Sequence, residues 1–403
     1  MERNLQQAVQ LVQAGLLASS SSHLQSLYYF GNLSPHIPGL SDLSLMALVS
    51  DRTSLEQVRI AFLPLWSQTQ SALNHPLAAA TAATWQRHLD LNPIVAHHLA
   101  RHSQRLWGSE MPVVRKLPPL TERAAFMADI SMQASQALTA PLLSPTDAPL
   151  YQGWLHGVAH LLGLSPSRHT APASLFAAIQ ARLATLVPQA EAAPDPAHLL
   201  APPRPAEPPP LADAPPMLPE LLAIYEKADR LIFVLPDQPP SWEKMDWLAV
   251  AETITGECAA LQITTARQFR LAVSYHYPVH YVLRSYRHLW GQDVLANLPV
   301  TRRRLWQDAA RLPSLLETVQ LPQRYLAAAD DELSAVIHDF QNKLLNVQLR
   351  HELLLRMKIA VKIAPPAPLP PRTDPPAQRI AGIFQHLNFW ANLYFDLMQQ
   401  QPS

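Results

Sequence analysis

The chain has 403 residues, of which 48% are hydrophobic, and this content is enough to bury the cores of two or three domains. Its 31 basic and 31 acidic residues give a formal net charge of zero, so no long-range field favours nucleic acid or an anionic membrane as a partner. A single cysteine, Cys258, excludes an internal disulfide framework and suits a reducing compartment. We therefore expect a cytoplasmic protein.

The first 22 residues predict an amphipathic helix and not a signal peptide. Glu2 and four glutamines interrupt the apolar core that a signal peptide would need, whereas Leu5, Val9, Val12 and Leu16 recur on one helical face. No segment of the chain approaches the ~18 apolar residues of a membrane span. We expect this helix to dock on the protein itself or on a partner.

Proline and glycine punctuate the chain as expected for helices joined by stiff connections. There are 40 prolines and only 10 glycines, and the prolines cluster outside the segments with apolar periodicity. Only RLIFVLP at 230–236 has the composition of a strand, and it is equally compatible with a buried helical turn. The sequence predicts an all-α fold.

Two proline-rich runs divide this predicted fold. The first, 187–219, is dominated by proline and alanine, a composition that favours an extended spacer. The second, 364–377, precedes the last apolar-patterned segment. We predict a helical domain over 1–186, a linker over 187–219, a second helical domain over 220–363, a linker over 364–377 and an amphipathic helix over 378–403.

The two halves also share short motifs in nearly the same register. His97, Arg101 and the run Leu106-Trp107-Gly108 recur as His280, Arg284 and Leu289-Trp290-Gly291, so that Trp290 follows Trp107 by 183 positions. Leu155-His156 recurs as Ile337-His338, with His338 following His156 by 182 positions. These two anchors favour an old internal duplication. The alternative is a coincidence between helical segments of similar composition.

The order of these segments resembles the HD-related output domain (HDOD) family of bacterial signalling proteins. Asn92-Pro93 stands where that family has Asp-Pro, and the segments around His156 and around His338-Asp339 are similar to its His-Asp segment. The resemblance covers about 60–190 and 220–360 and implies two degenerate helical signalling domains. The chain departs from the family pattern at Gly157, which stands where the aspartate after His156 is expected.

His338 and Asp339 are the weak candidates for chemistry. An HD-type phosphohydrolase would need an upstream histidine and a distant aspartate to complete the metal site. The sequence has no histidine between Pro299 and Ile337 and no aspartate between Phe340 and Thr373, so we expect no bound metal and no cofactor.

A second interpretation concerns phosphate transfer. His338, Asp339, Asn342 and Leu344 match the phosphoacceptor box of histidine kinases, but no ATP-binding domain follows them, so that only passive phosphotransfer is left. A third interpretation is a remnant kept for packing. His338 would then be partly buried on a helix that is packed on two apolar faces, one of which carries Leu345 and Leu349.

The interpretation that we favour is a catalytically inactive scaffold for protein interaction or signalling. Its protein partner cannot be identified from the sequence, and a homodimer is compatible with it. The candidate partner-binding residues are Trp107, Trp290 and the C-terminal stripe Ile380, Phe384, Leu387, Trp390 and Leu393. A core role for the two tryptophans, and docking of the stripe within the chain, are the alternatives. A metal-dependent phosphohydrolase using His338 and Asp339, and a phosphotransfer protein with His338 as acceptor, are the alternative functions.

Overall fold

The computed structural model shows an α/β protein, so the all-α prediction is wrong. In addition to the helices, the fold contains two four-stranded mixed sheets. The structure describes residues 2–30, 43–73, 75–110, 118–167, 169–191, 199–200, 221–227, 230–237, 260–276, 286–296, 298, 300–360, 362–364 and 366–400. Cys258, His280 and most of the predicted linker 187–219 lie outside these residues.

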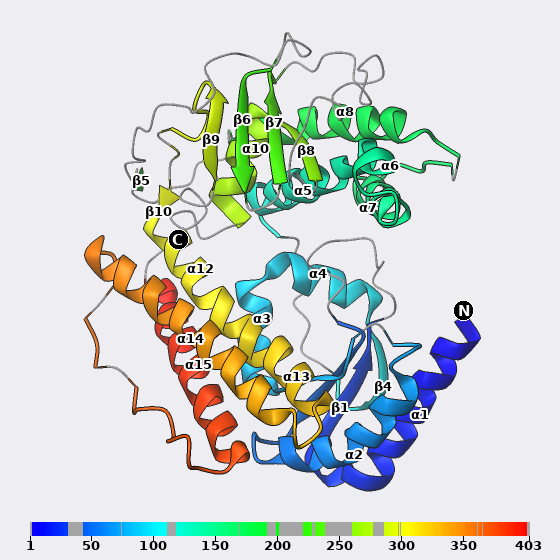
Figure 1. The fold of residues 1–403 in the computed structure, drawn as a ribbon, viewed down its shortest axis with the longest axis vertical. Coiled ribbons are helices and arrows are strands. Elements are labelled where there is room, and N and C mark those ends of the chain that lie inside the picture. Colours follow the sequence, from blue (N-terminus) through cyan, green and yellow to red (C-terminus); the bar gives the residue numbers. More distant parts are fainter. Residues whose placement is uncertain are drawn as a thin grey trace. The chain divides into compact units, whose positions relative to one another are not determined.

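The first sheet has the strand order β3-β2-β1-β4, and two of its strands, β1 and β4, are labelled in Figure 1. Its strands are β1 (Leu24–Tyr29), β2 (Leu45–Val49), β3 (Ala78–Thr81) and β4 (Gln104–Gly108). β1 is antiparallel to β2 and β4, whereas β2 and β3 are parallel. A parallel pair needs a crossover connection, which here contains helix α2 (Ser54–Thr69).

The second sheet repeats this topology with the order β8-β7-β6-β9. Its strands are β6 (Ala223–Lys227), β7 (Arg230–Leu235), β8 (Ala260–Thr265) and β9 (Arg287–Gly291). β6 is antiparallel to β7 and β9, and β7 is parallel to β8. The strand-like run 230–236 thus contains β7. A separate two-stranded sheet pairs β5 (Leu199–Leu200) with β10 (Val300–Thr301).

The described helices are distributed over both halves of the sequence. In the first half they are α1 (Glu2–Ser20), the 3₁₀ turn η1 (Ser21–His23), α2, α3 (Ala82–Leu91), α4 (Pro93–His102), α5 (Leu120–Ala134), the 3₁₀ turn η2 (Ser135–Leu138), α6 (Ala140–Leu143), α7 (Ala148–Leu161) and α8 (Pro172–Glu191). In the second half they are α10 (Ala266–His276), α12 (Arg302–Leu315), the π-helical turn η4 (Leu316–Gln320), α13 (Leu321–Ala327), α14 (Leu333–Arg356) and α15 (Pro376–Gln399).

The Leu-Trp-Gly repeat occupies the same place in both sheets. Trp107 pairs with Leu27 across the β1–β4 ladder, and Trp290 pairs with Ile224 across the β6–β9 ladder, with the same bulge one residue further along. Gly108 and Gly291 both have positive φ, +83° and +81°. An alanine Cβ would lie 2.1 Å from a carbonyl oxygen of the neighbouring strand at either position, so only glycine fits. Shared topology, register and bulge are the geometry expected of an internal duplication.

The compact units do not coincide with the two halves of the sequence. Unit 1 contains residues 1–33, 40–117 and 306–403, and unit 2 contains residues 34–39 and 118–305. Each unit therefore combines the sheet of one half with the helices that follow the sheet of the other half. The predicted division at 187–219 cuts across both units, because local helical patterns do not reveal which sheet a helix covers.

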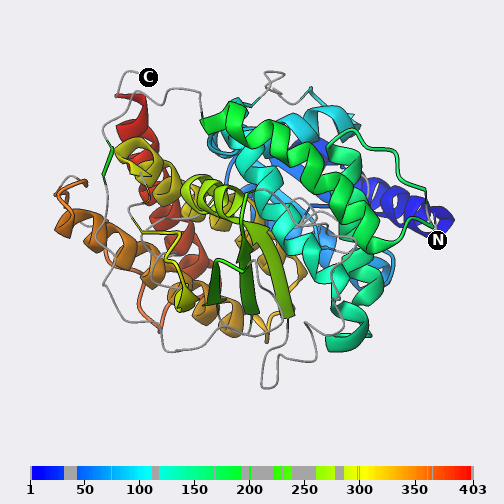
Figure 2. The same ribbon diagram turned by 90° about the horizontal axis from the view of Figure 1, so that it is seen from above.

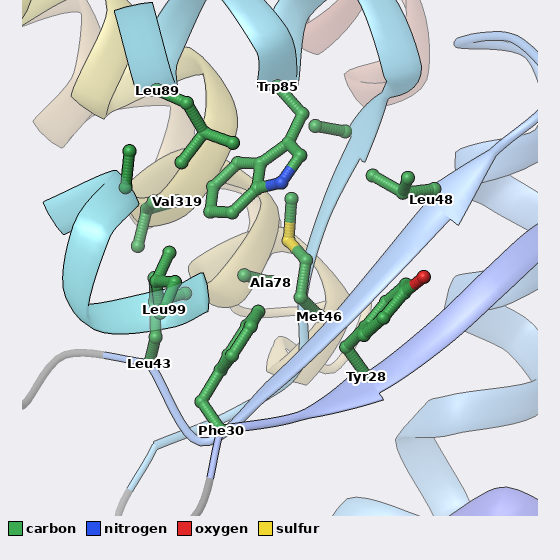
Figure 3. Packing of buried hydrophobic residues seen from close by; sticks show 12 residues of the cluster. Tyr28, Phe30, Leu43, Met46, Leu48, Ala78, Trp85, Leu89, Leu99 and Val319 are labelled. Carbon is green, nitrogen blue, oxygen red and sulfur yellow. The ribbon is translucent and has the colours of Figure 1, made fainter. Parts of the chain in front are cut away.

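The core of unit 1 shows this combination directly (Figure 3). One face of the first sheet contributes Tyr28, Phe30, Met46 and Leu48, because alternate strand residues point to the same side. Trp85 and Leu89 of α3 and Leu99 of α4 cover this face. Val319, which comes from η4 in the other half of the sequence, completes the cluster.

Unit 2 is built in the same way around β8. All six residues of β8 are buried, as expected of a parallel strand that is covered on both faces. α10 packs against β7 and β8 and lies beside α5 (Figure 2). Leu271 of α10 joins Ala124 and Ala125 of α5 and Val187 of α8 in one apolar cluster.

The packing of the long helices corrects one expectation. The apolar stripe of α14 is buried as predicted, and it consists of Leu333, Val336, Ile337, Phe340, Leu344 and Val347. The other apolar face is not packed, because Leu345 and Leu349 are 56% and 51% exposed. No helix among the described residues combines the length and the apolar content needed to cross a bilayer.

Candidate functional site at the carboxyl ends of the parallel strands

The carboxyl ends of β2 and β3 are the first place to look for a site in unit 1. In α/β sheets, ligands bind outside the carboxyl ends of parallel strands, where loops and helix N-termini converge. Arg52 follows β2 in the loop before α2, and Arg87 lies one turn into α3, which starts directly after β3. Arg52 and Arg87 are distant in the sequence, and the parallel pairing of β2 and β3 brings them to the same end of the sheet. We call this end, where the parallel strands have their carboxyl ends, the carboxyl edge.

Glu317 of the π-helical turn η4 joins the two arginines. Its Oε1 accepts a hydrogen bond from Nη2 of Arg52, and its Oε2 accepts one from Nη2 of Arg87. The side chains of Glu317 and Arg87 are only 2% and 7% exposed, whereas that of Arg52 is 30% exposed. Nη1 of Arg87 also donates to Oδ1 of Asn388, at 2.9 Å, and to Oδ1 of Asn392, both on α15. π-Helical turns are frequent at functional sites, so this network is the main candidate in unit 1.

The charges of this network compensate one another inside the fold. Burial raises the pKa of Glu317, and the neighbouring Arg87 and Arg52 act in the opposite direction. Burial lowers the pKa of Arg87, and the carboxylate of Glu317 opposes this shift. A buried charge is tolerated only when it is paired and hydrogen-bonded, and here each group meets that need through the others.

His88 lies behind the network and cannot act as an acid at neutral pH. Its ring stacks on Trp85, with centroids 5.4 Å apart, and its Nδ1 lies 3.2 Å from Oγ of Ser314. Full burial, together with the positive charges of Arg87 and Arg311, lowers the pKa of His88 to about 3. The imidazole is therefore neutral, and its role is packing.

The described residues at the corresponding edge of unit 2 include the ion pair Asp237–Arg267 and two neutral glutamines. Asp237 follows β7, and its Oδ1 accepts a hydrogen bond from the backbone amide of Arg267, at 2.8 Å. Nε2 of Gln268 donates to Oε1 of Gln180 at 2.8 Å, and Nε2 of Gln180 donates to Oγ of Ser131 at 3.1 Å. A small pocket of about 50 Å³ adjoins these residues.

Among the described residues, the helix N-termini at these two edges are capped by side chains of the chain. A helix N-terminus binds phosphate through backbone amides that have no other partner. Here carboxylates of the chain take that place, because Asp51 accepts from the amide of Ser54 at the start of α2 and Asp237 accepts from Arg267 at the start of α10. The side chain of Thr81 caps α3 in the same way. The pocket of about 50 Å³ is much smaller than the ~300–1,000 Å³ of typical small-molecule sites.

The structure places two cations beside Asp339 of the doublet His338-Asp339. Oδ2 of Asp339 lies 3.2 Å from Nζ of Lys343 and 3.5 Å from Nη1 of Arg324, and two cations so close disfavour a bound metal. His338 is exposed, and its Nε2 lies 3.3 Å from Nδ2 of Asn342. Among the described residues, no cluster of three or more histidine, cysteine, aspartate or glutamate side chains could hold a metal ion.

The predicted C-terminal stripe packs inside unit 1. Ile380, Phe384, Leu387 and Trp390 are buried, and Leu393 is half-buried. The proline-rich run before α15 also folds back on it, because Nε2 of His386 is 2.6 Å from the carbonyl oxygen of Ala367. The C-terminal stripe is thus covered by other residues of the same chain.

The two predicted tryptophans lie elsewhere. Trp107 and Trp290 are half-buried on β4 and β9, the strands at the ends of the two sheets. The structure places them at equivalent positions of two similar sheets.

Sequence reasoning missed the pair Arg87 and Glu317. The available signal was an acidic residue, Glu317, inside the apolar run PSLLETVQL, since a charge there must find a partner when the run is buried. The partner on α3 could not be found without the fold. No protein-family model, no curated protein and no solved structure matches this chain.

Proposed function

We propose that this protein acts by binding another protein, as a catalytically inactive scaffold for interaction or signalling in the cytoplasm. The observation that carries the proposal is that Trp107 and Trp290 are both half-buried at equivalent positions of the end strands β4 and β9. Tryptophan is enriched among the residues that dominate binding energy at protein interfaces. The membership in the HDOD family remains a prediction, and the proposal does not depend on it.

The end strands supply a mode of binding as well as side chains. None of the five residues of β4 is buried, and among the described residues no strand pairs with the outer edge of β4 or β9. An unpaired edge presents backbone donors and acceptors to an extended segment of a partner, while side-chain pockets give specificity. Two such edges on one chain would allow a partner to bind at two places.

The polar contacts described at the carboxyl edges support the same proposal, because they join side chains of the protein to one another. Arg87 bonds to Glu317, Gln268 bonds to Gln180, and the pocket beside Gln268 has a volume of only about 50 Å³. A catalytic site needs groups that are positioned but still available to a substrate.

The test uses a photo-crosslinking amino acid placed at single positions of the chain in its own cells. We expect substitutions at Arg105 and Arg287, on the two end strands, to capture the same partner, identified by mass spectrometry. The matched control is Leu150 on α7, which is 41% exposed and lies outside both end strands. Trp107→Ala and Trp290→Ala, which shorten a side chain without changing the strand, should each reduce capture. Equal capture at Leu150, or capture unchanged by both substitutions, would refute the proposal.

Phosphotransfer remains the second candidate, because His338 is exposed and therefore accessible to a phosphate donor. Acid-labile phosphate on the purified protein that is lost in His338→Ala would support it. The phosphohydrolase alternative is tested by elemental analysis of protein purified without chelator. About one equivalent of iron, manganese or zinc that disappears in His338→Ala would support a metal enzyme and overturn the scaffold proposal.

A further inference from the structure

Each unit combines the sheet of one half of the sequence with helices from the other half, and we call this arrangement the helix exchange. It does not depend on the proposed function. Unit 1 places β1 to β4 with the helices after residue 306, and unit 2 places β6 to β9 with α5 to α8. We infer that each half of the chain is the binding partner of the other, as the two subunits of a helix-exchanged dimer would be, and that the fold does not need an intact peptide bond between Ala206 and Glu207.

Polar contacts of two buried arginines join the halves in unit 1. Arg87 in the first half bonds to Glu317 in the second half. Nη2 of Arg59 on α2 donates to the carbonyl oxygen of Ala328 at 2.8 Å and to Oδ1 of Asp330 at 2.6 Å. These bonds cross sequence separations of more than 200 residues, so the helices after residue 306 are an integral part of unit 1.

Unit 2 shows the reciprocal arrangement. The backbone amide of Ile263 on β8 donates to Oγ of Ser135 in η2, at 2.7 Å. β8 is the end strand of its sheet, so this serine satisfies a buried amide that no neighbouring strand can reach. Gln268 and Gln180 bond across the same boundary. The irregular turns η2 and η4 contact β8 and β3 respectively, which are equivalent strands of the two sheets.

The apolar cores impose the same requirement. Val319 fills the cluster on the first sheet, and the α5 and α8 residues Ala124, Ala125 and Val187 fill the cluster around Leu271. A half chain would expose these faces to water, and burial of apolar area is the main favourable term in folding and association. Each sheet therefore depends on helices from the opposite half.

The experiment uses the full chain with a protease site inserted between Ala206 and Glu207, within the proline-rich segment. The folded protein is cleaved and then analysed by native mass spectrometry and by thermal unfolding at several concentrations. We expect the fragments to stay together as a 1:1 complex. Because neither unit can remain folded after dissociation, the unfolding midpoint should fall by about 4 °C for a hundredfold dilution. Uncleaved protein is the control, and its midpoint should not depend on concentration.

Two substitutions make the test specific. Glu317→Ala removes a pair that joins the halves, whereas Glu226→Ala removes the pair Glu226–Arg287, which lies within the second half. We expect only Glu317→Ala to steepen the loss of complex on dilution. Fragments that separate while both remain folded, or a midpoint that is independent of concentration after cleavage, would overturn the inference, because either result means that each half folds by itself.

Discussion

Removal of the Glu317 carboxylate is the sharpest test of the buried network in unit 1. Glu317→Ala leaves Arg87, whose side chain is 7% exposed, without its only carboxylate partner among the hydrogen bonds described above. The two asparagines that accept from its other nitrogen are neutral and cannot replace the charge. Arg52 loses a partner too, but at 30% exposure water can solvate part of its guanidinium group.

The magnitude follows from this difference in burial. Breaking a buried ion pair by removing one partner costs about 3–5 kcal/mol, because the remaining charge is left uncompensated. Most of this loss should come from Arg87. For a folded unit of roughly 200 residues, each kcal/mol shifts the unfolding midpoint by about 2–4 °C, so Glu317→Ala should lower the midpoint of unit 1 by about 6–20 °C. Glu317→Gln keeps the shape of the side chain and loses its charge. Its unfolding midpoint should therefore lie between those of the unsubstituted protein and Glu317→Ala.

Hydrogen exchange measured by mass spectrometry resolves the effect by region. We expect faster exchange in peptides from β2, α3 and η4 of the variant, with little change in β7 and β8, which belong to the other unit. Glu226→Ala is the matched control, since its partner Arg287 is 63% exposed and a surface pair contributes at most about 1 kcal/mol. A loss of less than about 1 kcal/mol in the free energy of unfolding for Glu317→Ala, or equal changes of hydrogen exchange in both units, would show that the network does not stabilise unit 1 in this way.

Two further predictions follow from single residues. His88 has a pKa of about 3 in the fold and about 6.5 in the unfolded chain, so the unfolded chain binds a proton at a higher pH than the folded chain does. The free energy of unfolding should therefore fall by about 1.4 kcal/mol per pH unit as the pH is lowered from 6.5 towards 3. His88→Gln should reduce this slope by one proton in urea titrations at several pH values, and an unchanged slope would contradict the assignment. Gly108→Ala and Gly291→Ala should lower the midpoint far more than Gly163→Ala, because all three have positive φ but only Gly163 has open space for a Cβ. Similar losses at the three glycines in calorimetry would mean that the backbone clash is relieved.

The sequence predicted the repeat better than it predicted the fold. Leu-Trp-Gly recurs because a tryptophan at the sheet edge and a glycine with positive φ are needed at both equivalent places, and such needs are local. The strand β3 has the sequence AAAT, which by composition favours a helix and becomes a strand only because β2 pairs with it. β2 is a short run of apolar residues, and such runs cannot be distinguished from buried helical turns by periodicity.

The helix exchange lies beyond local reasoning for a different reason. The apolar stripe of α14 and that of α15 were both visible, and both are buried. An apolar stripe indicates that a helix packs against another element, but it does not identify that element. Two similar sheets in one chain offer two similar surfaces on which the helix could pack. Residues that differ between the units supply the missing information: Glu317 fits an edge that carries Arg52 and Arg87, whereas Ser135 fits an edge that carries the amide of Ile263. Placing η2 at the first sheet would leave Arg87 buried without a carboxylate, so the buried charges favour the observed pairing over the alternative.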